Sequence, residues 1–266
     1  MSALLMIQGT SAAAGKTIIS TALCRLLAEK GYRTAPFCVF SSGEMLELPG
    51  GGKISRSQFM QAEAAGVTPV PEMNPILLKA VSDTTYEVIH NNKNLGEMTQ
   101  KEFRSFLATA FTDIYASLAV LSQKYDVVII EGVGTPVELH KPELAVANMR
   151  LAGEFNIPVL LATDIDRGGM FAYVTGTLAL LRPQERQLVK GVVVNRFRGF
   201  KDRLQGGLKM LEEIIQIPVI GVLPYLNDLS LLPPVSAEKR LFFYKLLSQI
   251  LRENLDLKFI WELIQQ

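Results

Sequence analysis

A loop of small residues that ends in a lysine and a threonine is the part of this sequence best suited to chemistry. Residues 9–17 read Gly-Thr-Ser-Ala-Ala-Ala-Gly-Lys-Thr and lie between an apolar run and an amphipathic one. Small residues let backbone N–H groups converge on phosphate oxygens, a lysine neutralises the outer phosphates, and a hydroxyl ligates Mg²⁺. The glycines are one residue further apart than in the general motif, with Thr10 in place of the first glycine. The order of strand, loop and helix favours a phosphate site over a helix start made of small residues for packing alone.

A glutamate follows the clearest strand of the sequence. Val127–Ile130 is entirely apolar and β-branched, and Glu131 comes directly after it, ahead of Gly132 and Gly134. A carboxylate at the carboxyl end of such a strand faces the ligand crevice of an open α/β sheet and can hold Mg²⁺ directly or through water. A solvated acid in a turn is the alternative. Because the loop at Gly15 already requires an acid in this region, we expect Glu131 to belong to the same site.

Polar residues also follow two later strands. Asp164, Asp166 and Arg167 come after an apolar run, where they suit a substrate or metal site as well as they suit a helix cap. Asn195 follows another apolar run, and its amide has the donor and acceptor needed to read a purine edge. Asparagine is also common in turns, so this pattern is weak by itself, and the Gly221–Pro224 turn is weaker still.

The elements that must position these residues alternate between short apolar runs and longer amphipathic segments, as in strand–helix units around a parallel sheet. Lys79–Ile89 is expected to be extended and residues 91–94 to turn the chain. The expected strands are Ala3–Ile7, Thr34–Phe40, Val127–Glu131, Pro158–Ala162, Gly191–Val194 and Val219–Val222. The expected helices are Thr17–Lys30, Arg56–Ala65, Lys101–Lys124, Ala172–Leu181, Leu204–Ile215, Lys239–Leu251 and a short one from Asn254.

These units predict an α/β fold of the P-loop NTPase type, with a doubly wound, mostly parallel sheet and helices on both faces. We expect one domain over residues 1–232. A helical tail over residues 233–266, which begins at the linker Leu232–Pro234, is expected to pack on this domain or on a partner.

Composition excludes several other classes of protein. The 266 residues carry 27 Lys+Arg against 26 Asp+Glu, so neither nucleic acid nor an anionic membrane is an expected partner. No run approaches the ~18 apolar residues of a membrane span, and the short apolar start lacks a basic leader. Cys24 and Cys38 have no metal-type spacing and fit the reducing cytoplasm. A mean hydropathy of +0.23 favours an apolar face that meets a partner chain or a missing domain.

Seven stretches, in order along the chain, resemble the N-terminal synthetase domain of the cobyric acid synthase family, the glutamine-dependent amidases of the cobalamin pathway. Cobyrinic acid a,c-diamide synthase and dethiobiotin synthetase are relatives of this family. The stretches cover most of the chain, and the long glycine spacing of the phosphate loop is normal in the family. They are Gln8–Thr17, Gln61–Val67, Met73–Lys79, Glu131–Glu138, Asp164–Gly169, Asn195–Gly199 and Gly221–Pro224.

The resemblance implies that ATP phosphorylates a corrinoid carboxylate and that ammonia then displaces phosphate to leave an amide. It implies catalytic roles for Lys16, Glu131 and Asp164, with Mg²⁺ on Thr17 and Glu131. The residues implied to bind the nucleotide are Gly9, Thr10, Ala14, Gly15, Lys16, Thr17, Asn195 and Pro224. Toward the substrate lie Glu138, Asp166 and Arg167, with Arg56, Gln58, Gln61 and Lys79 as further crevice candidates.

The sequence departs from the family at three places. Cys38 and the residues after it replace a lysine and a polar stretch, which removes a cation expected to face the phosphates. Ala13 stands where the loop usually has an aspartate, and His140 stands where the family favours asparagine. Neither cysteine has the surroundings of a glutaminase nucleophile, so we expect no glutaminase domain in this chain. The chain is then either part of a longer enzyme or a stand-alone subunit, with ammonia from a separate source such as a glutaminase subunit.

Two other functions fit parts of the sequence. The change around Cys38 favours a homologue that binds nucleotide without catalysis and acts as a regulatory or interaction module. A ParA/MinD-type ATPase switch is discounted, because those proteins carry an extra lysine early in the loop and residues 10–14 have none. We expect the enzyme, in the form of a homo-oligomer.

Overall fold

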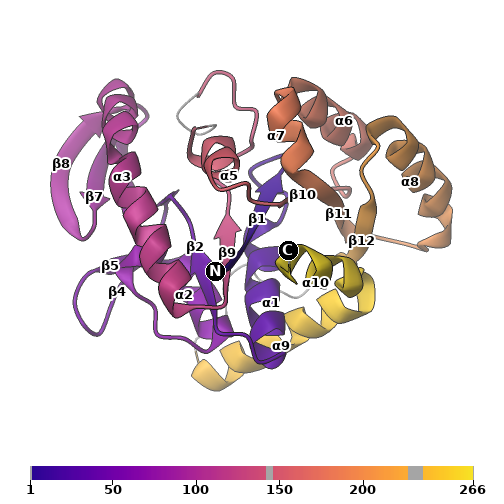
Figure 1. The fold of residues 1–266 in the computed structure, drawn as a ribbon, viewed down its shortest axis with the longest axis horizontal. Coiled ribbons are helices and arrows are strands. Elements are labelled where there is room, and N and C mark those ends of the chain that lie inside the picture. The colour runs from indigo at the N-terminus through magenta and orange to yellow at the C-terminus, as the bar shows by residue number, and fades with distance from the viewer. Residues whose placement is uncertain (1, 142–145, 227–235, 266) are drawn as a thin grey trace.

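Six parallel strands form the central sheet of the computed structural model, which describes residues 2–141, 146–226 and 236–265. The strand order is β12-β11-β10-β1-β9-β2, so the chain builds outward from β1 in one direction and then in the other. This is the doubly wound arrangement expected from the sequence (Figure 1). The strands are β1 (Ala3–Gly9), β2 (Thr34–Phe37), β9 (Val127–Glu131), β10 (Val159–Asp164), β11 (Val189–Phe197) and β12 (Val219–Pro224).

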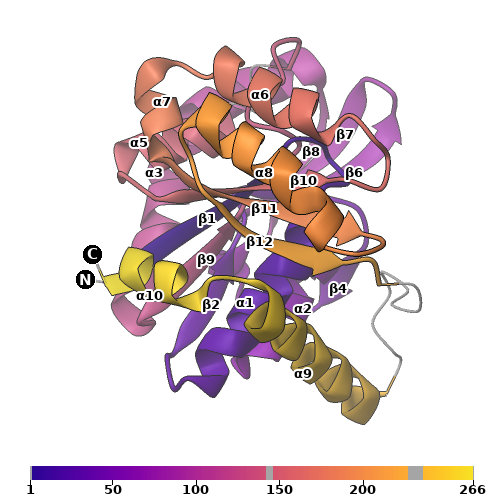
Figure 2. The same ribbon diagram turned by 90° about the vertical axis from the view of Figure 1, so that its right-hand side faces the viewer.

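Helices cover both faces of this sheet, as expected (Figure 2). Alternate residues of β9 point to opposite faces, so Val127 and Ile129 enter one core while Val128 and Ile130 enter the other. The first core is closed by α1 (Lys16–Glu29), α2 (Arg56–Ala65), α9 (Ala237–Asn254) and α10 (Leu257–Gln265). The second is closed by α3 (Gln100–Lys124), α5 (Leu151–Glu154), α6 (Met170–Leu180), α7 (Pro183–Leu188) and α8 (Asp202–Ile215), with a π-helical turn at Val146–Arg150.

The segment between β2 and α3 differs from the sequence prediction. Thr34–Phe40 is not one strand: β2 ends at Phe37, and the Asn74 side chain donates to the Cys38 carbonyl oxygen at 3.1 Å where the chain leaves the sheet. Lys79–Ile89 is not one extended segment but parts of two antiparallel strands. The elements here are β3 (Phe40–Ser42), β4 (Met45–Glu47), β5 (Lys53–Ser55), a 3-10 turn (Pro71–Met73), β6 (Ile76–Ser82), β7 (Thr85–His90) and β8 (Lys93–Thr99).

These short strands build two small sheets beside the main one. The larger has the order β3-β6-β7-β8, and β4 pairs with β5 around a glycine turn in which Gly51 and Gly52 have φ of 87° and 92°. The next helix, α3, begins where Thr99 and Glu102 form a reciprocal capping box. One later prediction also changes, because Gly221–Pro224 is the end of a strand rather than a turn. The predicted linker Leu232–Pro234 lies outside the described residues.

Helix α3 is the one described helix that is long and apolar enough, by length and composition, to cross a membrane. Its apolar side is occupied in this fold, since Phe103, Leu107, Ile114 and Leu118 are buried in the core between α3 and the sheet. The core helix of a soluble protein meets the same criteria of length and composition. The composition of α3 therefore gives no argument for a membrane span.

Helix α9 packs on α1 and is tied to α2 by polar contacts. Glu63 of α2 accepts hydrogen bonds from Arg240 at 2.7 Å and from the Tyr244 hydroxyl at 2.8 Å. Burial would raise the pKa of the Glu63 carboxyl, but the bonds from Arg240 and Tyr244 outweigh it and hold that pKa below its ordinary value. Glu29 of α1 makes similar contacts, accepting from Ser248 and Arg252 of α9.

We predict that Glu63→Gln lowers the free energy of unfolding by about 1 kcal/mol at pH 7, because it weakens charge-assisted hydrogen bonds. A carboxyl with a lowered folded-state pKa stabilises the fold above its unfolded pKa and loses that contribution as the pH falls through the folded value. The difference between wild type and variant should therefore shrink below about pH 4. Urea unfolding from pH 3 to pH 7 measures it.

Glu262→Gln on α10 is the matched control, since Glu262 faces Lys258 at 3.9 Å and both side chains are mostly exposed. It should leave the unfolding free energy unchanged. If Glu63→Gln lowers the free energy of unfolding by the same amount at pH 3 as at pH 7, the contact does not depend on ionised Glu63 and the assignment is contradicted.

Candidate active site

The candidate residues gather at one edge of the main sheet. The phosphate loop follows β1, Glu131 ends β9, Asp164 ends β10, Asn195 lies near the end of β11 and Pro224 ends β12. Parallel strands bring their carboxyl ends to the same edge, and the order of the chain reverses at β1, where ligands bind in this class of sheet. Residues far apart in the sequence therefore surround one crevice.

Close backbone packing explains why the phosphate loop needs its small residues. A Cβ atom on Gly9 would lie 2.9 Å from the Ala14 Cβ, and one on Gly15 would lie 2.0 Å from the Asn195 side-chain nitrogen. Gly15 also has φ of 97°, a left-handed conformation that residues with a Cβ avoid. Thr10 ties the loop to β10 through a 3.0 Å hydrogen bond to the Thr163 hydroxyl.

Lys16 lies at the centre of the loop and is 5% exposed. Its ammonium donates to the carbonyl oxygens of Gly134 at 2.8 Å, Ala12 at 3.2 Å and Ser11 at 3.3 Å. Burial lowers the pKa of Lys16, while the nearby charge of Glu131 opposes the change. Charged phosphate oxygens are stronger acceptors than carbonyls, so the ammonium can exchange these partners for phosphate.

Thr17 and Glu131 place two oxygen donors side by side. The Thr17 hydroxyl donates to Glu131 Oε1 at 2.6 Å, and the Gln61 side-chain nitrogen donates to Glu131 Oε2. Burial raises the pKa of the Glu131 carboxyl, and the bonds from Thr17 and Gln61 and the charge of Lys16 act against it. A hydroxyl and a carboxylate beside a phosphate loop fit Mg²⁺, which takes few protein ligands and fills the rest with phosphate and water.

No group of three or more His, Cys, Asp or Glu residues suited to a metal occurs in the described part of the chain.

Asn195 is committed to the phosphate loop in this structure. It is 7% exposed, its side-chain nitrogen donates to the Ala14 carbonyl at 3.0 Å, and its side-chain oxygen accepts from the Arg196 backbone at 2.9 Å. These contacts explain the need for glycine at position 15, where a side chain would displace the amide. The sequence predicted Asn195 at a purine edge and did not anticipate that it supports the loop.

Asp164 is the centre of a charged network at the ends of β10 and β11. It is 4% exposed and accepts from Arg196 at 2.8 Å, with Arg167 at 3.6 Å. Its other oxygen accepts from the backbone of Asp166, whose own carboxylate accepts from Arg198 at 2.7 Å. The structure thus brings Asp164, Asp166 and Arg167 together, as predicted, and adds Arg196, to which the sequence gave no role.

Glu138 and His140 lie in the loop after β9. Their side chains are 3.6 Å apart, and the Glu138 charge is close enough to Lys16 to affect its pKa. Pro224 lies half-buried at the end of β12.

The looser crevice candidates divide into two groups. Gln58 and Gln61 are fully buried and linked to Glu131. Arg56 instead pairs with Glu44, and Lys79 is mostly exposed and pairs with Glu87 at 3.6 Å.

Asn148 is a residue of this region that the sequence did not single out. Its amide accepts from the Val133 backbone nitrogen at 2.7 Å and donates to the Val133 carbonyl at 2.5 Å, which fixes the loop whose Gly134 carbonyl meets Lys16. It is 1% exposed. No local pattern marks such a residue, because its contacts depend on how the π-helical turn packs on the loop.

Cys38 lies in the crevice, so the departure from the family falls at the site itself. It is 5% exposed, and its thiol contacts the Phe40 carbonyl oxygen at 3.2 Å. Burial raises the pKa of the Cys38 thiol, the charge of Glu131 adds to this and that of Lys16 opposes it. A neutral thiol therefore lies near Lys16 and Glu131, where the resemblance leads us to expect a cation.

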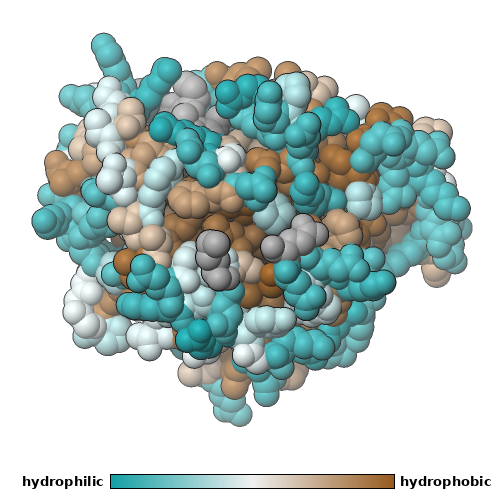
Figure 3. Space-filling view, viewed as in Figure 1, coloured by the Kyte–Doolittle hydropathy of each residue, from teal (hydrophilic) through white to brown (hydrophobic). Residues whose placement is uncertain are grey.

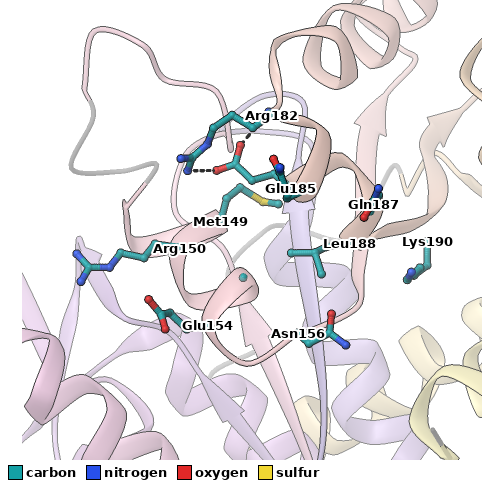
Figure 4. Close-up of a pocket in the computed structure, with 11 residues that line it drawn as sticks. Met149, Arg150, Glu154, Asn156, Arg182, Glu185, Gln187, Leu188 and Lys190 are labelled. Carbon is teal, nitrogen blue, oxygen red and sulfur yellow. Dashed lines mark hydrogen bonds and ion pairs between the residues drawn. The ribbon is translucent and has the colours of Figure 1, made fainter.

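Two cavities lie at the other edge of the sheet, away from these residues. One of about 890 Å³ lies between α5 and α7, where Arg182 pairs with Glu185 and Lys190 points away from them (Figure 4). Another of about 620 Å³ has a mostly apolar lining from β1, α3 and α10, and Figure 3 shows apolar side chains in the hollow of this face. None of the predicted site residues lines either cavity.

Comparison with known sequences gives the family. The family model described as AAA domain matches residues 4–231. The chain belongs to the AAA-domain family. This agrees with the P-loop NTPase type of fold expected from the sequence, since the AAA domain includes the phosphate loop and all six strands of the main sheet.

The AAA domain has close relatives among curated proteins. Cobyric acid synthase of Trichormus variabilis (strain ATCC 29413 / PCC 7937) is 45% identical over 231 residues, 85% of this chain and 46% of that protein. The enzyme of the same name from Vibrio vulnificus (strain YJ016) is 44% identical over 87% of this chain and 48% of its own length. The resemblance to the cobyric acid synthase family is thus confirmed, and the chain spans about half the length of these relatives.

Solved structures with a similar fold are distant in sequence. The signal recognition particle receptor FtsY from Elizabethkingia anophelis is 15% identical, with a TM-score of 0.47 over 92% of this chain and 65% of that one. MinD from Aquifex aeolicus is 11% identical, with a TM-score of 0.47 over 90% of this chain and 86% of that one. Likenesses of this degree say nothing about activity.

We predict that Gly15→Ala abolishes nucleotide binding, because a Cβ there both strains the backbone and displaces the Asn195 amide from the loop. Gly31→Ala is the matched control: Gly31 has φ of 90°, but a Cβ would meet nothing within 4 Å. The control should lose about 1–2 kcal/mol of stability from backbone strain alone and should bind nucleotide normally. Equilibrium binding of a fluorescent ATP analogue and urea unfolding of both variants measure this. Normal binding by Gly15→Ala would contradict the loop geometry.

Proposed function

We propose that this AAA domain is an ATP-dependent synthetase unit of cobalamin biosynthesis that amidates side-chain carboxylates of a corrinoid through an acyl phosphate. The observation that carries the proposal is the 2.6 Å contact between Thr17 and Glu131 beside the buried Lys16. It joins a phosphate-binding cation and a pair of metal donors in one crevice. The relatives named cobyric acid synthase supply the substrate class.

The chemistry needs positioning and charge neutralisation more than covalent help from the protein. A carboxylate is a poor electrophile because oxide would have to leave. Transfer of the γ-phosphoryl group to a carboxylate oxygen releases ADP, and ammonia then attacks the acyl carbon and releases phosphate. Lys16 and the loop N–H groups would hold the phosphates in line with the carboxylate. Thr17 and Glu131 would hold Mg²⁺, which when bound neutralises phosphate charge.

The other residues divide between nucleotide and corrinoid. Asn195 and Pro224 would lie beside the adenine ring. Asn195 would do so while its side-chain nitrogen supports the phosphate loop through the Ala14 carbonyl. Asp164 would act at the reacting carboxylate, held in place by its arginine partners. The residues proposed to face the corrinoid are Glu138, Asp166 and Arg167.

The proposal extends to the setting of the enzyme. Ammonia would come from a source outside this AAA domain, and the chain would act as a homo-oligomer in the cytoplasm. Exposed apolar side chains support an interface with another chain, and they include Phe171, Phe200, Met210, Ile214 and Phe242.

One observation favours a second function. The neutral thiol of Cys38 stands in the crevice where the family has a cation, and loss of such a cation removes stabilisation of the transferring phosphoryl group. A regulatory or interaction module that binds nucleotide without catalysis is therefore the alternative.

Incubation with ATP, Mg²⁺, ammonium and a cobyrinic acid diamide separates the two functions. The synthetase should release ADP only when the corrinoid is present, and the corrinoid should lose about 1 Da for each carboxylate converted to an amide, because NH₂ replaces OH. ADP release is followed by a coupled assay and the product by mass spectrometry. Nucleotide binding without corrinoid-dependent ADP would leave the module as the function.

We predict that Lys16→Ala abolishes ATP binding, because it removes the cation at the centre of the loop. Isothermal titration calorimetry with a non-hydrolysable ATP analogue measures it, and Lys258→Ala on the exposed face of α10 is the control. Unchanged affinity in Lys16→Ala would contradict the placement of the phosphates in this loop.

A further inference from the structure

Both carboxylate oxygens of Glu131 are held, but by different elements. Oε1 accepts from Thr17 at the start of α1, and Oε2 accepts from the side-chain nitrogen of Gln61 on α2. Thr17 and the carboxylate belong to the proposed Mg²⁺ site. Gln61 has no such role, yet it is fully buried and touches the same carboxylate.

A second glutamine fixes the orientation of the first. The Gln58 side-chain nitrogen donates to Gln61 Oε1 at 3.3 Å, and the two residues lie on one side of α2, three positions apart. An amide that accepts on its oxygen must present its N–H groups on the other side, which is where Glu131 lies. Ser55, whose side chain caps the start of α2, holds Gln58 in the first turn.

The burial of these side chains argues against a role in packing alone. Gln58 and Gln61 are both 0% exposed, and an amide taken out of water costs free energy unless it is hydrogen-bonded. Gln58 Oε1 has no hydrogen-bond partner among the described residues, so burying this pair costs free energy that an apolar pair would not. Apolar side chains of the same length would fill this space more cheaply, as Met60 does on the same helix.

Mg²⁺ binding would explain why the fold buries these two amides. The ion demands near-ideal octahedral geometry, so a carboxylate that turns freely binds it poorly. Partners behind a ligating side chain typically change metal affinity by about 10–100-fold. A donor on Oε2 stops the Glu131 carboxylate from rotating and leaves Oε1 beside the Thr17 hydroxyl.

We propose that Gln61, oriented by Gln58, is a positioning residue that aims Glu131 Oε1 at the Mg²⁺ held with Thr17. The inference rests on the proposed Mg²⁺–ATP site and adds a function for α2 beyond its packing on α1 and its contact with α9 through Glu63. The two glutamines act through Glu131 and touch neither phosphate nor corrinoid.

The test measures how nucleotide binding depends on Mg²⁺. A fluorescent, non-hydrolysable ATP analogue is titrated with Mg²⁺, and the concentration for half of the Mg²⁺-dependent gain in binding is compared between variants. Gln61→Met keeps the length of the side chain and removes its hydrogen bonds. It should raise that concentration about tenfold and leave binding in EDTA unchanged. Gln58→Met should raise it less, because Gln61 remains but is free to turn.

Glu63→Gln is the matched control on the same helix, since it changes a carboxylate that contacts α9 and should not alter the Mg²⁺ dependence. An unchanged Mg²⁺ requirement in folded Gln61→Met overturns the proposal. If Gln61→Met fails to fold by circular dichroism, an unchanged requirement in Gln58→Met overturns it instead. A wild-type protein that binds the analogue equally well with Mg²⁺ and with EDTA contradicts the Mg²⁺–ATP site itself, which is a separate outcome.

Discussion

The crevice depends on the register of β9 against β1. Glu131 pairs with Ile7 in the parallel ladder, two residues before the phosphate loop begins at Gly9. That register brings the carboxylate within 2.6 Å of the Thr17 hydroxyl at the start of α1, although 114 residues separate them in sequence. A shift of one residue would turn Glu131 to the opposite face of the sheet, because side chains alternate along a strand. The apolar residues before Glu131, which fill both cores, prevent that shift.

Features set by neighbours in sequence could be predicted, and features set by distant contacts could not. Helix α2 has the bounds predicted for it, Arg56–Ala65, and the structure shows that groups next to it in sequence set both ends: Ser55 caps its start, and Gly66 ends it in a left-handed conformation. The main sheet and the position of Glu131 were predicted for the same reason, from buried runs with no competing pattern. The division of Thr34–Phe40 into two strands depends on Asn74, which is 36 positions from Cys38, and no local pattern reports such a contact.

The same limit applies to the candidate site. Sequence reasoning brought Lys16, Thr17 and Glu131 together, because each belongs to a motif with a known place at a strand end. It could not find that Gln61 holds Glu131 or that Asn195 supports the phosphate loop, since these contacts span 70 and 181 residues. Both contacts are made by side-chain amides, whose role is hard to predict from sequence. A neutral side chain with a donor and an acceptor suits a turn, a cap or a buried contact equally well.

The charges of the crevice show what the thiol at position 38 changes. Lys16 is already buried with a lowered pKa, so a second buried ammonium beside it would repel it and deepen the desolvation cost before any phosphate binds. A thiol avoids that cost and leaves the empty crevice more stable. A thiol also lacks the positive charge that would attract the triphosphate and the phosphoryl group in transfer. Arg196 and Arg167 do not replace that charge, because both pair with Asp164. In the proposed synthetase, neutralisation would then fall on Lys16, on the loop N–H groups and on Mg²⁺, which would make the geometry of Glu131 more important than in a site with a second lysine.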